Sequence, residues 1–566
     1  MQRRQVLGLG LTTAAAAVLG PLAISDLRAG DAGRYAPAFA RLDAFVEQYL
    51  RDLNAPAMTL ALADANGLVR VADYGFDDPA LGTRLATGRL FHIGSISKSF
   101  TALCVLQLVD EGKLDLHRPI KGYLPWLRFE AATRELTAHD LLTHGAALPD
   151  GALFPADPAF RHRPTAAPGS FFHYCNMGYE ALGHLVATLD DRPLAESLRA
   201  RVIAPLGMSE TAPVITFDIV DRLASSYLLP LGDRPAPHGA RLAAALPIVM
   251  TEGSGCVAST ARDMGAYLTM LVNGGHAGNA RVASEAGFAL FATPHIKADE
   301  FGKDASYGYG IAVDTLDGHR RLRHTGGMVS FASALEVDRD SGVGVFASVN
   351  AMQGVRPRPV AEYALRLMRA CREGASLPPV PAARDAAEVA AAADYAGRYL
   401  APDGRALEVV ADGARLYLVV RGARVVLEPL AGPADAFAVR HPDYAHFPLA
   451  FGREHADGTG PVVEAGFGGD WYAHARYSGP REFAVPAEWH GYVGHYRDEN
   501  PWIGSLTVVL RRGRLWLGGV VPLEPAAGGR FYLRDDPDSP EWVEFADLAR
   551  GRAMRIVLSG ASLVRV

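Results

Sequence analysis

The sequence predicts a multidomain chain: an α+β unit over residues 33–374, followed by two small antiparallel β-barrels. Three observations support this prediction. The chain has 566 residues, well beyond the roughly 100 to 200 residues of one ordinary domain. Hairpin patterns stand at both ends of the first unit with helical patterns between them, which is typical of α+β folds. The remainder of the chain repeats itself.

The composition restricts the class of protein. Charged residues make up 21% of the chain and the hydrophobic set 49%, close to the average of soluble proteins. These values exclude disordered, collagen-like and polytopic membrane proteins. The net charge of -6 argues against a nucleic-acid partner, because binding to phosphates needs basic stripes.

The N-terminus has the features of an export signal. Arg3 and Arg4 precede a moderately apolar run, and this pattern resembles a twin-arginine signal. We assign residues 1–32 to the signal, with cleavage between Ala23 and Ala32; a membrane anchor and a chance arginine pair are the alternatives. No later run approaches the roughly 20 apolar residues that span a bilayer. We therefore expect an exported protein, periplasmic or extracellular, without an integral membrane domain after signal removal.

The first unit opens with a helix and a hairpin. The apolar residues that recur at helical i, i+3, i+4 spacing are Leu42, Phe45, Val46, Tyr49 and Leu50. Two apolar runs, residues 58–63 and 68–74, then flank Asn66-Gly67. That pair suits the positive φ angles of a tight turn, so a β-hairpin is expected.

A second hairpin is expected near the end of the unit. Residues 332–337 and 343–349 are strand-like and surround a turn that contains Asp340 and Gly342. Strands at both ends with helices between them predict a sheet that is closed by segments far apart in the sequence.

The C-terminal part of the chain is a duplicated module. Residues 375–392 are rich in proline and alanine and predict a linker. Three short motifs then occur twice in the same order: Gly397-Arg398-Tyr399 and Gly494-His495-Tyr496, Arg415-Leu416-Tyr417-Leu418 and Arg514-Leu515-Trp516-Leu517, Leu427-Glu428-Pro429 and Leu523-Glu524-Pro525. Short alternating strands and glycine turns predict a small antiparallel barrel for each copy, residues 393–485 and 486–566.

The strongest chemical signal is an S-x-x-K motif formed by Ser95 and Lys98. Lysine is rare in this chain, with five occurrences, so the motif carries some weight. An apolar helix is expected here, with Ser95 on its first turn and Lys98 on the same face. A serine hydroxyl needs a neighbouring base or cation to become a nucleophile, and a buried lysine can supply either. A helix-capping serine beside an outward-facing lysine is the structural alternative.

Two further motifs are weak when taken alone. Tyr174 and Asn176 form Y-x-N at the start of a second helical pattern, where a core tyrosine and a helix cap would be the ordinary explanation. His324, Thr325 and Gly326 form H-T-G at the end of a strand-like run.

Together and in this order, the three motifs resemble those of the serine β-lactamase and penicillin-binding-protein superfamily. They are most similar to the class C β-lactamase branch, which also holds DD-peptidases, D-aminopeptidases and family VIII carboxylesterases. The run L-L-T-H-G-A-A-L at residues 141–148 is similar to the L-L-T-H-T-S-G-L segment of that branch. The resemblance spans the first unit and implies a β-lactamase/transpeptidase-like fold, with an antiparallel sheet flanked by helices plus a helical subdomain.

The resemblance implies a role for each site residue. Ser95 would be the acylated nucleophile, Lys98 would keep it activated, and Tyr174 would be the general base or its relay. Asn176 would hold the substrate amide. His324 would occupy the position that is lysine in the β-lactamases.

The oxyanion hole and the strand-side contacts follow from the same resemblance. Backbone N–H groups of Ser95 and Gly327 would stabilise the tetrahedral oxyanion, and Thr325 and Gly326 would contact the substrate. The reaction would pass through an acyl-enzyme without a metal or an organic cofactor.

The histidine in H-T-G indicates which of the possible substrate classes to expect first. K-T-G is the usual β-lactamase form, whereas H-T-G is similar to DD-peptidases and D-aminopeptidases, and histidine weakens the fixed cation for a β-lactam carboxylate. Two lipocalin-like barrels after the catalytic unit also resemble the D-aminopeptidases, in which a barrel loop reaches the active site. The expected substrates are small D-amino-acid amides or peptides, with esters next and β-lactams last.

One loop of the second copy invites a sharper hypothesis. Asp498 and Glu499 lie in residues 497–504, a stretch longer than its counterpart in the first copy. If this stretch folds over Ser95, one of the two carboxylates could pair with the ammonium group of a substrate. An exposed hairpin is the plainer interpretation.

Other enzyme classes find little support. The chain has no G-x-S-x-G, H-E-x-x-H, P-loop or G-x-G-x-x-G motif. Its four cysteines, Cys104, Cys175, Cys256 and Cys371, show no C-x-x-C spacing, so zinc and thioredoxin chemistry are not expected, and disulfide pairing stays open. The alternative from another class is a binding protein that keeps the fold and has lost catalysis.

Overall fold

The computed structural model describes residues 23–25, 32–154, 159, 161–352, 356–430, 432, 434–455, 457–499, 502, 504–533 and 539–566. The arginine pair and most of the predicted export signal lie outside these residues. Among the described helices, none is both long enough and apolar enough to cross a membrane.

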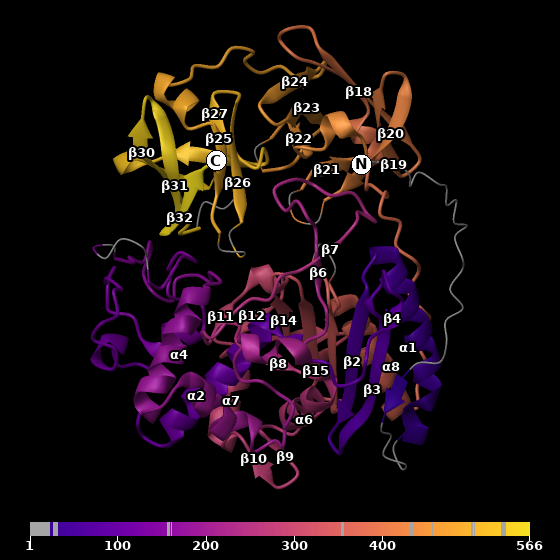
Figure 1. Ribbon diagram of the computed structural model, residues 1–566, viewed down its shortest axis with the longest axis vertical. Helices are drawn as coiled ribbons and strands as arrows, with labels where there is room; N and C mark the ends of the chain where they lie inside the picture. The colour runs from indigo at the N-terminus through magenta and orange to yellow at the C-terminus, as the bar shows by residue number, and fades with distance from the viewer. Residues whose placement is uncertain are drawn as a thin grey trace, which may run out of the picture.

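A large antiparallel sheet forms the centre of the first unit (Figure 1). In spatial order its strands are β1 (Ala23–Ser25), β3 (Gly67–Asp78), β2 (Ala57–Asp64), β16 (Val343–Val349), β15 (Ala332–Asp338), β14 (His319–Gly327), β13 (Ala312–Leu316), β12 (Ser306–Tyr307) and β11 (Ile296–Lys297), with β4 (Thr83–Arg84) paired to β3. Both predicted hairpins are confirmed, as β2–β3 and β15–β16. They pair with each other through β2 and β16, where Met58 lies opposite Val349, so distant segments close the sheet as expected.

Helices cover both faces of this sheet. On one face α1 (Ala32–Leu53) and α8 (Arg358–Glu373) pack in one core with alternate residues of β2 and β16. The other face and the helical subdomain hold α2 (Ser97–Asp110), α3 (Ala138–Leu142), α4 (Asn176–Asp190), α5 (Leu194–Leu198), α6 (Ala261–Val272) and α7 (Glu285–Ala292). Burial of these apolar faces is the main stabilising contribution to such a layered unit.

Short strand pairs and helical turns complete the unit. The pairs are β5 (Phe91–His92) with β8 (Ala258–Ser259), β6 (Tyr227–Leu228) with β7 (Ala243–Ala244), and β9 (His276–Ala277) with β10 (Ala280–Arg281). The turn η1 (Gly94–Ile96) connects β5 to α2.

The strand that carries H-T-G is an interior strand of the sheet. Strand β14 lies inside the sheet, between β13 and β15. However, its pairing with β13 ends at Arg323, opposite Ala312, whereas its pairing with β15 continues to Gly327. The segment that contains His324 therefore has an open edge, because β13 is shorter than β14.

The duplicated module forms two closed antiparallel barrels, as predicted. The first consists of β17 (Gly397–Leu400), β18 (Ala406–Asp412), β19 (Arg415–Val420), β20 (Ala423–Pro429), β21 (Ala436–Val439), β22 (Leu449–Arg453), β23 (Val462–Phe467) and β24 (Asp470–His474). The second consists of β25 (Gly494–Arg497), β26 (Ser505–Arg511), β27 (Arg514–Leu517), β28 (Val521–Pro525), β29 (Arg530–Leu533), β30 (Trp542–Ala549), β31 (Arg552–Leu558) and β32 (Ala561–Arg565).

The repeated motifs occupy equivalent strands of the two barrels. Each G-x-Y motif begins the first strand, and its tyrosine hydroxyl donates to the carbonyl four residues earlier, from Tyr399 to Tyr395 and from Tyr496 to Tyr492, at 2.7 Å in both. Both tyrosine side chains are fully buried. Both barrels lie on the same side of the catalytic unit (Figure 1).

Candidate active site

Ser95 lies in a turn that exposes its side chain. It belongs to η1, directly before α2 begins at Ser97, rather than to the first turn of the helix. All the other residues between Phe91 and Phe100 are buried, whereas Ser95 is half-buried. The turn therefore presents a hydroxyl to solvent from an otherwise closed core segment.

Lys98 approaches this hydroxyl from within the core. Its fully buried Nζ lies 3.2 Å from Ser95 Oγ, 2.7 Å from Asn176 Oδ1 and 2.8 Å from the Ser254 carbonyl oxygen. Burial lowers the pKa of Lys98 from 10.5 to about 7, although neighbouring carboxylates such as Asp150 oppose this shift. A large fraction of the Lys98 amine is therefore neutral at neutral pH.

Tyr174 faces the same lysine. Lys98 Nζ lies 4.8 Å from the centre of the Tyr174 ring, and the His144 ring stacks 4.3 Å away on that tyrosine. Burial raises the pKa of Tyr174 above its ordinary value, and hydrogen bonding to Ser95 only partly opposes the shift. The phenol therefore keeps its proton near neutral pH, where the Lys98 amine can accept one.

Asn176 is the first residue of α4 and is held from two sides. Its Oδ1 accepts from Lys98, while its backbone N–H and its Nδ2 donate to the two carboxylate oxygens of Asp150, at 2.6 and 2.8 Å. The Asp150 bonds fix the orientation of the amide, because only its oxygen can accept from Lys98.

His324 is buried and held in its neutral form. Its Nε2 lies 2.8 Å from the Tyr307 hydroxyl and its Nδ1 2.7 Å from the Thr325 carbonyl oxygen. Burial lowers the pKa of His324 to about 3, and the nearby Lys98 contributes to the shift. Near neutral pH this residue therefore adds no positive charge to the site.

The H-T-G segment packs closely on the serine turn. A Cβ atom placed on Gly326 would lie 1.8 Å from the Ile93 carbonyl oxygen, so the strand can approach only because this residue is glycine. Gly94, with φ of 54°, faces the backbone of Gly327 in the same way. This packing places the Gly327 backbone against the turn that contains Ser95.

Carboxylates surround the lysine. Asp150 and Glu252 stand near Glu180 of α4, and burial together with repulsion from Glu252 and then Asp150 raises the pKa of Glu180 to about 7. The site therefore combines a weakly charged lysine with several acidic groups. Within the described part of the chain, no group of three or more His, Cys, Asp or Glu side chains is arranged to hold a metal ion.

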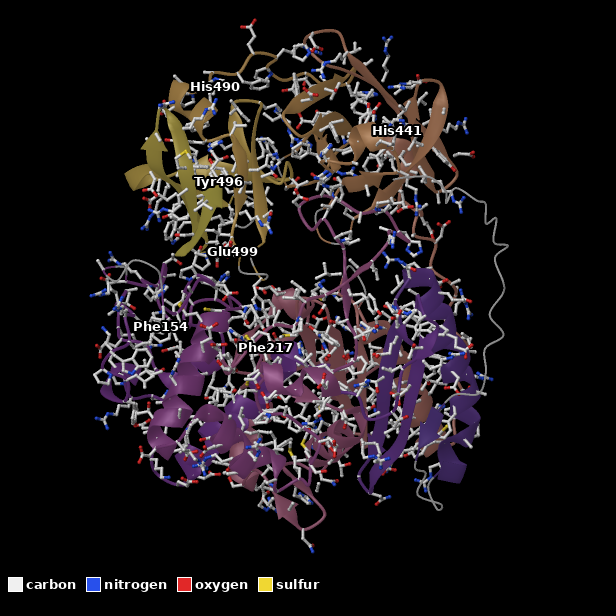
Figure 2. The ribbon with its side chains drawn as sticks, viewed as in Figure 1. Phe154, Phe217, His441, His490, Tyr496 and Glu499 are labelled. Carbon is white, nitrogen blue, oxygen red and sulfur yellow. The ribbon has the colours of Figure 1, made fainter. Side chains whose placement is uncertain are left out.

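The structure brings Ser95, Lys98, Tyr174 and Asn176 together. His324 is buried next to Tyr174. Glu499 is exposed on the side of the second barrel that faces the catalytic unit (Figure 2). The Asp498 N–H donates to the Gly504 carbonyl oxygen at 2.8 Å and closes its turn. Residues 500, 501 and 503 of this loop lie outside the described residues, and amine binding by Asp498 or Glu499 stays a prediction.

The sequence analysis missed several residues that hold the site. They are Asp150, His173, Ser254, Tyr307 and Glu541. Asp150 follows Leu148-Pro149 and Glu541 stands between Pro540 and Trp542, and neither position has a periodic or motif signal. The four cysteines are free thiols.

Comparisons with known proteins agree with this geometry. The Beta-lactamase family profile matches residues 42–370, more than half of the chain. Esterase EstB of Burkholderia gladioli is 28% identical over 243 residues, covering 38% of this chain and 60% of that protein. D-alanyl-D-alanine-carboxypeptidase/endopeptidase AmpH of Escherichia coli K12 is 27% identical over 251 residues, covering 40% and 61%. The match thus spans less than two thirds of each relative.

A solved structure extends the similarity in fold. The octameric penicillin-binding protein homologue from Pyrococcus abyssi superposes with a TM-score of 0.53 at 22% identity, over 76% of this chain and 99% of that one. At this identity the similarity concerns the fold. With the family match over the whole first unit and the S-x-x-K geometry described above, the chain belongs to the β-lactamase family of serine hydrolases.

Proposed function

We propose that this protein is an exported serine hydrolase that cleaves small D-amino-acid amides or peptides through an acyl-enzyme on Ser95. The observation that carries the proposal is the set of three oxygen atoms around Lys98 Nζ. A neutral amine has two hydrogens and one lone pair. It can donate to Asn176 and Ser254 and still accept the proton of Ser95.

Acylation follows from this arrangement. Ser95 Oγ attacks the substrate carbonyl carbon while its proton moves to Lys98 Nζ, and the carbonyl electrons move to the oxygen. Backbone N–H groups of Ser95 and Gly327 stabilise that oxyanion. Collapse of the tetrahedral intermediate breaks the bond to the leaving amine. This amine receives the former Ser95 proton from Lys98, directly or through Tyr174. A water molecule then releases the acyl group by the reverse sequence of proton transfers.

The electrostatics favour amine-bearing substrates over β-lactams. Neutral His324 gives no fixed cation for a carboxylate, whereas the carboxyl groups of Asp150 and Glu180 lie near Lys98. AmpH is named as a carboxypeptidase acting on D-alanyl-D-alanine, which supports the D-configuration. EstB is named as an esterase, so an esterase is the second candidate. Export is proposed from the arginine pair at the N-terminus.

A hydrolysis panel tests the proposal. Purified protein is compared with Ser95→Ala on D- and L-alanyl p-nitroanilides, D-Ala-D-Ala peptides, p-nitrophenyl butyrate and nitrocefin. Turnover of a D-amino-acid amide or peptide that disappears in the variant is expected. Turnover of the ester alone would favour the esterase, and a panel without Ser95-dependent signal would favour a non-catalytic binding protein.

The pH dependence tests the role of Lys98. Because the neutral amine accepts the proton, kcat/KM should increase as the pH rises through about 7, where Lys98 loses its proton. The rate of substrate hydrolysis measured from pH 5 to 9 gives this limb. A value of kcat/KM that stays flat through pH 7 and is still rising at pH 9 would contradict the assignment of a Lys98 amine with a lowered pKa as the base.

A further inference from the structure

A glutamate of the second barrel reaches the rim of the candidate active site. Glu541 lies directly before β30, and its side chain is only 16% exposed. Its Oε1 accepts from the backbone N–H of Asp150 at 2.6 Å and lies 3.1 Å from His173 Nε2. One carboxylate oxygen thus joins two loops of the catalytic unit that lie far from it in the sequence.

The contact between Glu541 and Asp150 is linked to Ser95 by further hydrogen bonds. Asp150, whose backbone is held by Glu541, binds Asn176 through both carboxylate oxygens. Asn176 accepts from Lys98, and Lys98 contacts Ser95. An unbroken series of hydrogen bonds therefore runs from the barrel to the Ser95 hydroxyl.

The second contact concerns the tyrosine. His173 precedes Tyr174, and its backbone N–H donates to the His144 carbonyl oxygen at 2.9 Å. The His144 ring in turn stacks on Tyr174. By holding the His173 ring, Glu541 restrains the backbone from which Tyr174 projects.

The barrel fixes Glu541 from its own side. The Ser559 hydroxyl donates to Glu541 Oε2, and the Trp542 N–H donates to Ser559 Oγ at 3.2 Å. Ser559 is fully buried. The two surfaces also meet without a gap, since a Cβ atom on Gly151 would lie 1.9 Å from the Ser559 carbonyl oxygen.

We propose that Glu541 is a positioning residue for the reaction: the second barrel completes the active site by setting Asn176 and Tyr174 in place through Asp150 and His173. Glu541 acts through these residues and touches no reacting atom. The inference rests on the proposed function of Ser95, and it makes the second barrel part of the enzyme rather than an appended binding module.

Glu541→Ala and Glu541→Gln test the proposal in the full chain. We expect Glu541→Ala to lower kcat about tenfold or more with a smaller change in KM, because misplaced groups act on the transition state. Glu541→Gln keeps an oxygen acceptor for the Asp150 N–H and should recover part of kcat. Glu428→Gln is the matched control, since Glu428 makes the corresponding contact of the first barrel with the catalytic unit, accepting from the His238 N–H.

A second readout does not depend on turnover. Hydrogen exchange of peptides covering residues 149–151 and 172–176 should become faster in Glu541→Ala and stay unchanged in Glu428→Gln. If wild-type protein shows no Ser95-dependent hydrolysis, the proposed function fails while the exchange measurement still tests the positioning. Circular dichroism checks that each variant is folded. Equal kcat and equal exchange in Glu541→Ala and wild type would overturn the proposal.

Discussion

The two barrels arose from one module, yet they meet the catalytic unit differently. In the first barrel Glu428 accepts from the His238 N–H at 2.5 Å and from Arg440 Nε of its own barrel at 2.6 Å. The equivalent glutamate of the second barrel, Glu524, pairs with Arg514 within that barrel. There Glu541, in the segment directly before β30, makes the contact with the catalytic unit.

The comparison shows which contacts both barrels keep and which contacts differ between them. The tyrosine contacts and the buried leucines that close each barrel are retained at equivalent strands. The glutamate itself is retained as Glu524, but its docking contact is not, and in the second barrel the loop residue Glu541 docks on the catalytic unit instead. In the first barrel an arginine partners the docking glutamate, whereas in the second a histidine of the catalytic unit does so.

Matched core substitutions give the largest expected effect. Leu416 and Leu515 are equivalent and both are fully buried, so Leu416→Ala and Leu515→Ala should each destabilise their barrel by about 2–5 kcal/mol. Thermal unfolding measures this loss. Hydrolysis by the folded protein should fall only for Leu515→Ala; an equal loss of kcat in both would remove the distinction between the barrels.

Substitution of Gly151 should separate the second barrel from the site. The added methyl group meets the Ser559 carbonyl oxygen, and relief of such overpacking costs about 1–3 kcal/mol. We expect Gly151→Ala to lower kcat/KM about tenfold. Gly232→Ala is the control, because open space surrounds that glycine; a normal rate in Gly151→Ala would show that docking does not matter for catalysis.

Loss of the first barrel's docking charge should affect stability alone. Glu428→Gln weakens the contacts to Arg440 and to the His238 N–H, each a partly exposed interaction, at a cost of about 1 kcal/mol. Differential scanning calorimetry should show a small decrease in the melting temperature of the protein. A large fall in kcat would mean that the first barrel also positions the site.

Low pH should weaken the contact of Glu541 with the catalytic unit, and this is the smallest of the expected effects. Burial raises the pKa of Glu541, but hydrogen bonds from His173, Ser559 and the Asp150 backbone outweigh it and hold the pKa below 4.5. A lower pKa in the folded protein means that the stabilisation is present above pH 4.5 and is lost as the pH falls through the folded-state value. The stability difference between wild type and Glu541→Gln should therefore shrink below pH 4.5, and a constant difference would contradict this.

Local signals account for most of what the sequence predicted. The Ser95 and Lys98 pair, the start of α4 at Asn176 and both hairpins follow from spacing within a few residues. The interior place of β14 did not follow, because β13 is a short strand of mixed polarity that gives little signal. The Asp150–Glu541 contact joins positions 391 apart in sequence, and a lone acidic residue in a loop carries no pattern that points to its partner.

The position of β16 inside the sheet limits when the sheet can fold during synthesis. This strand lies between β2 and β15, so the sheet that carries the H-T-G segment cannot close until synthesis has passed Val349. Glu541 leaves the ribosome later still, because it directly precedes β30 in the second barrel. The nascent enzyme therefore carries its nucleophile from the beginning of synthesis but acquires a complete active site only when the chain is almost finished.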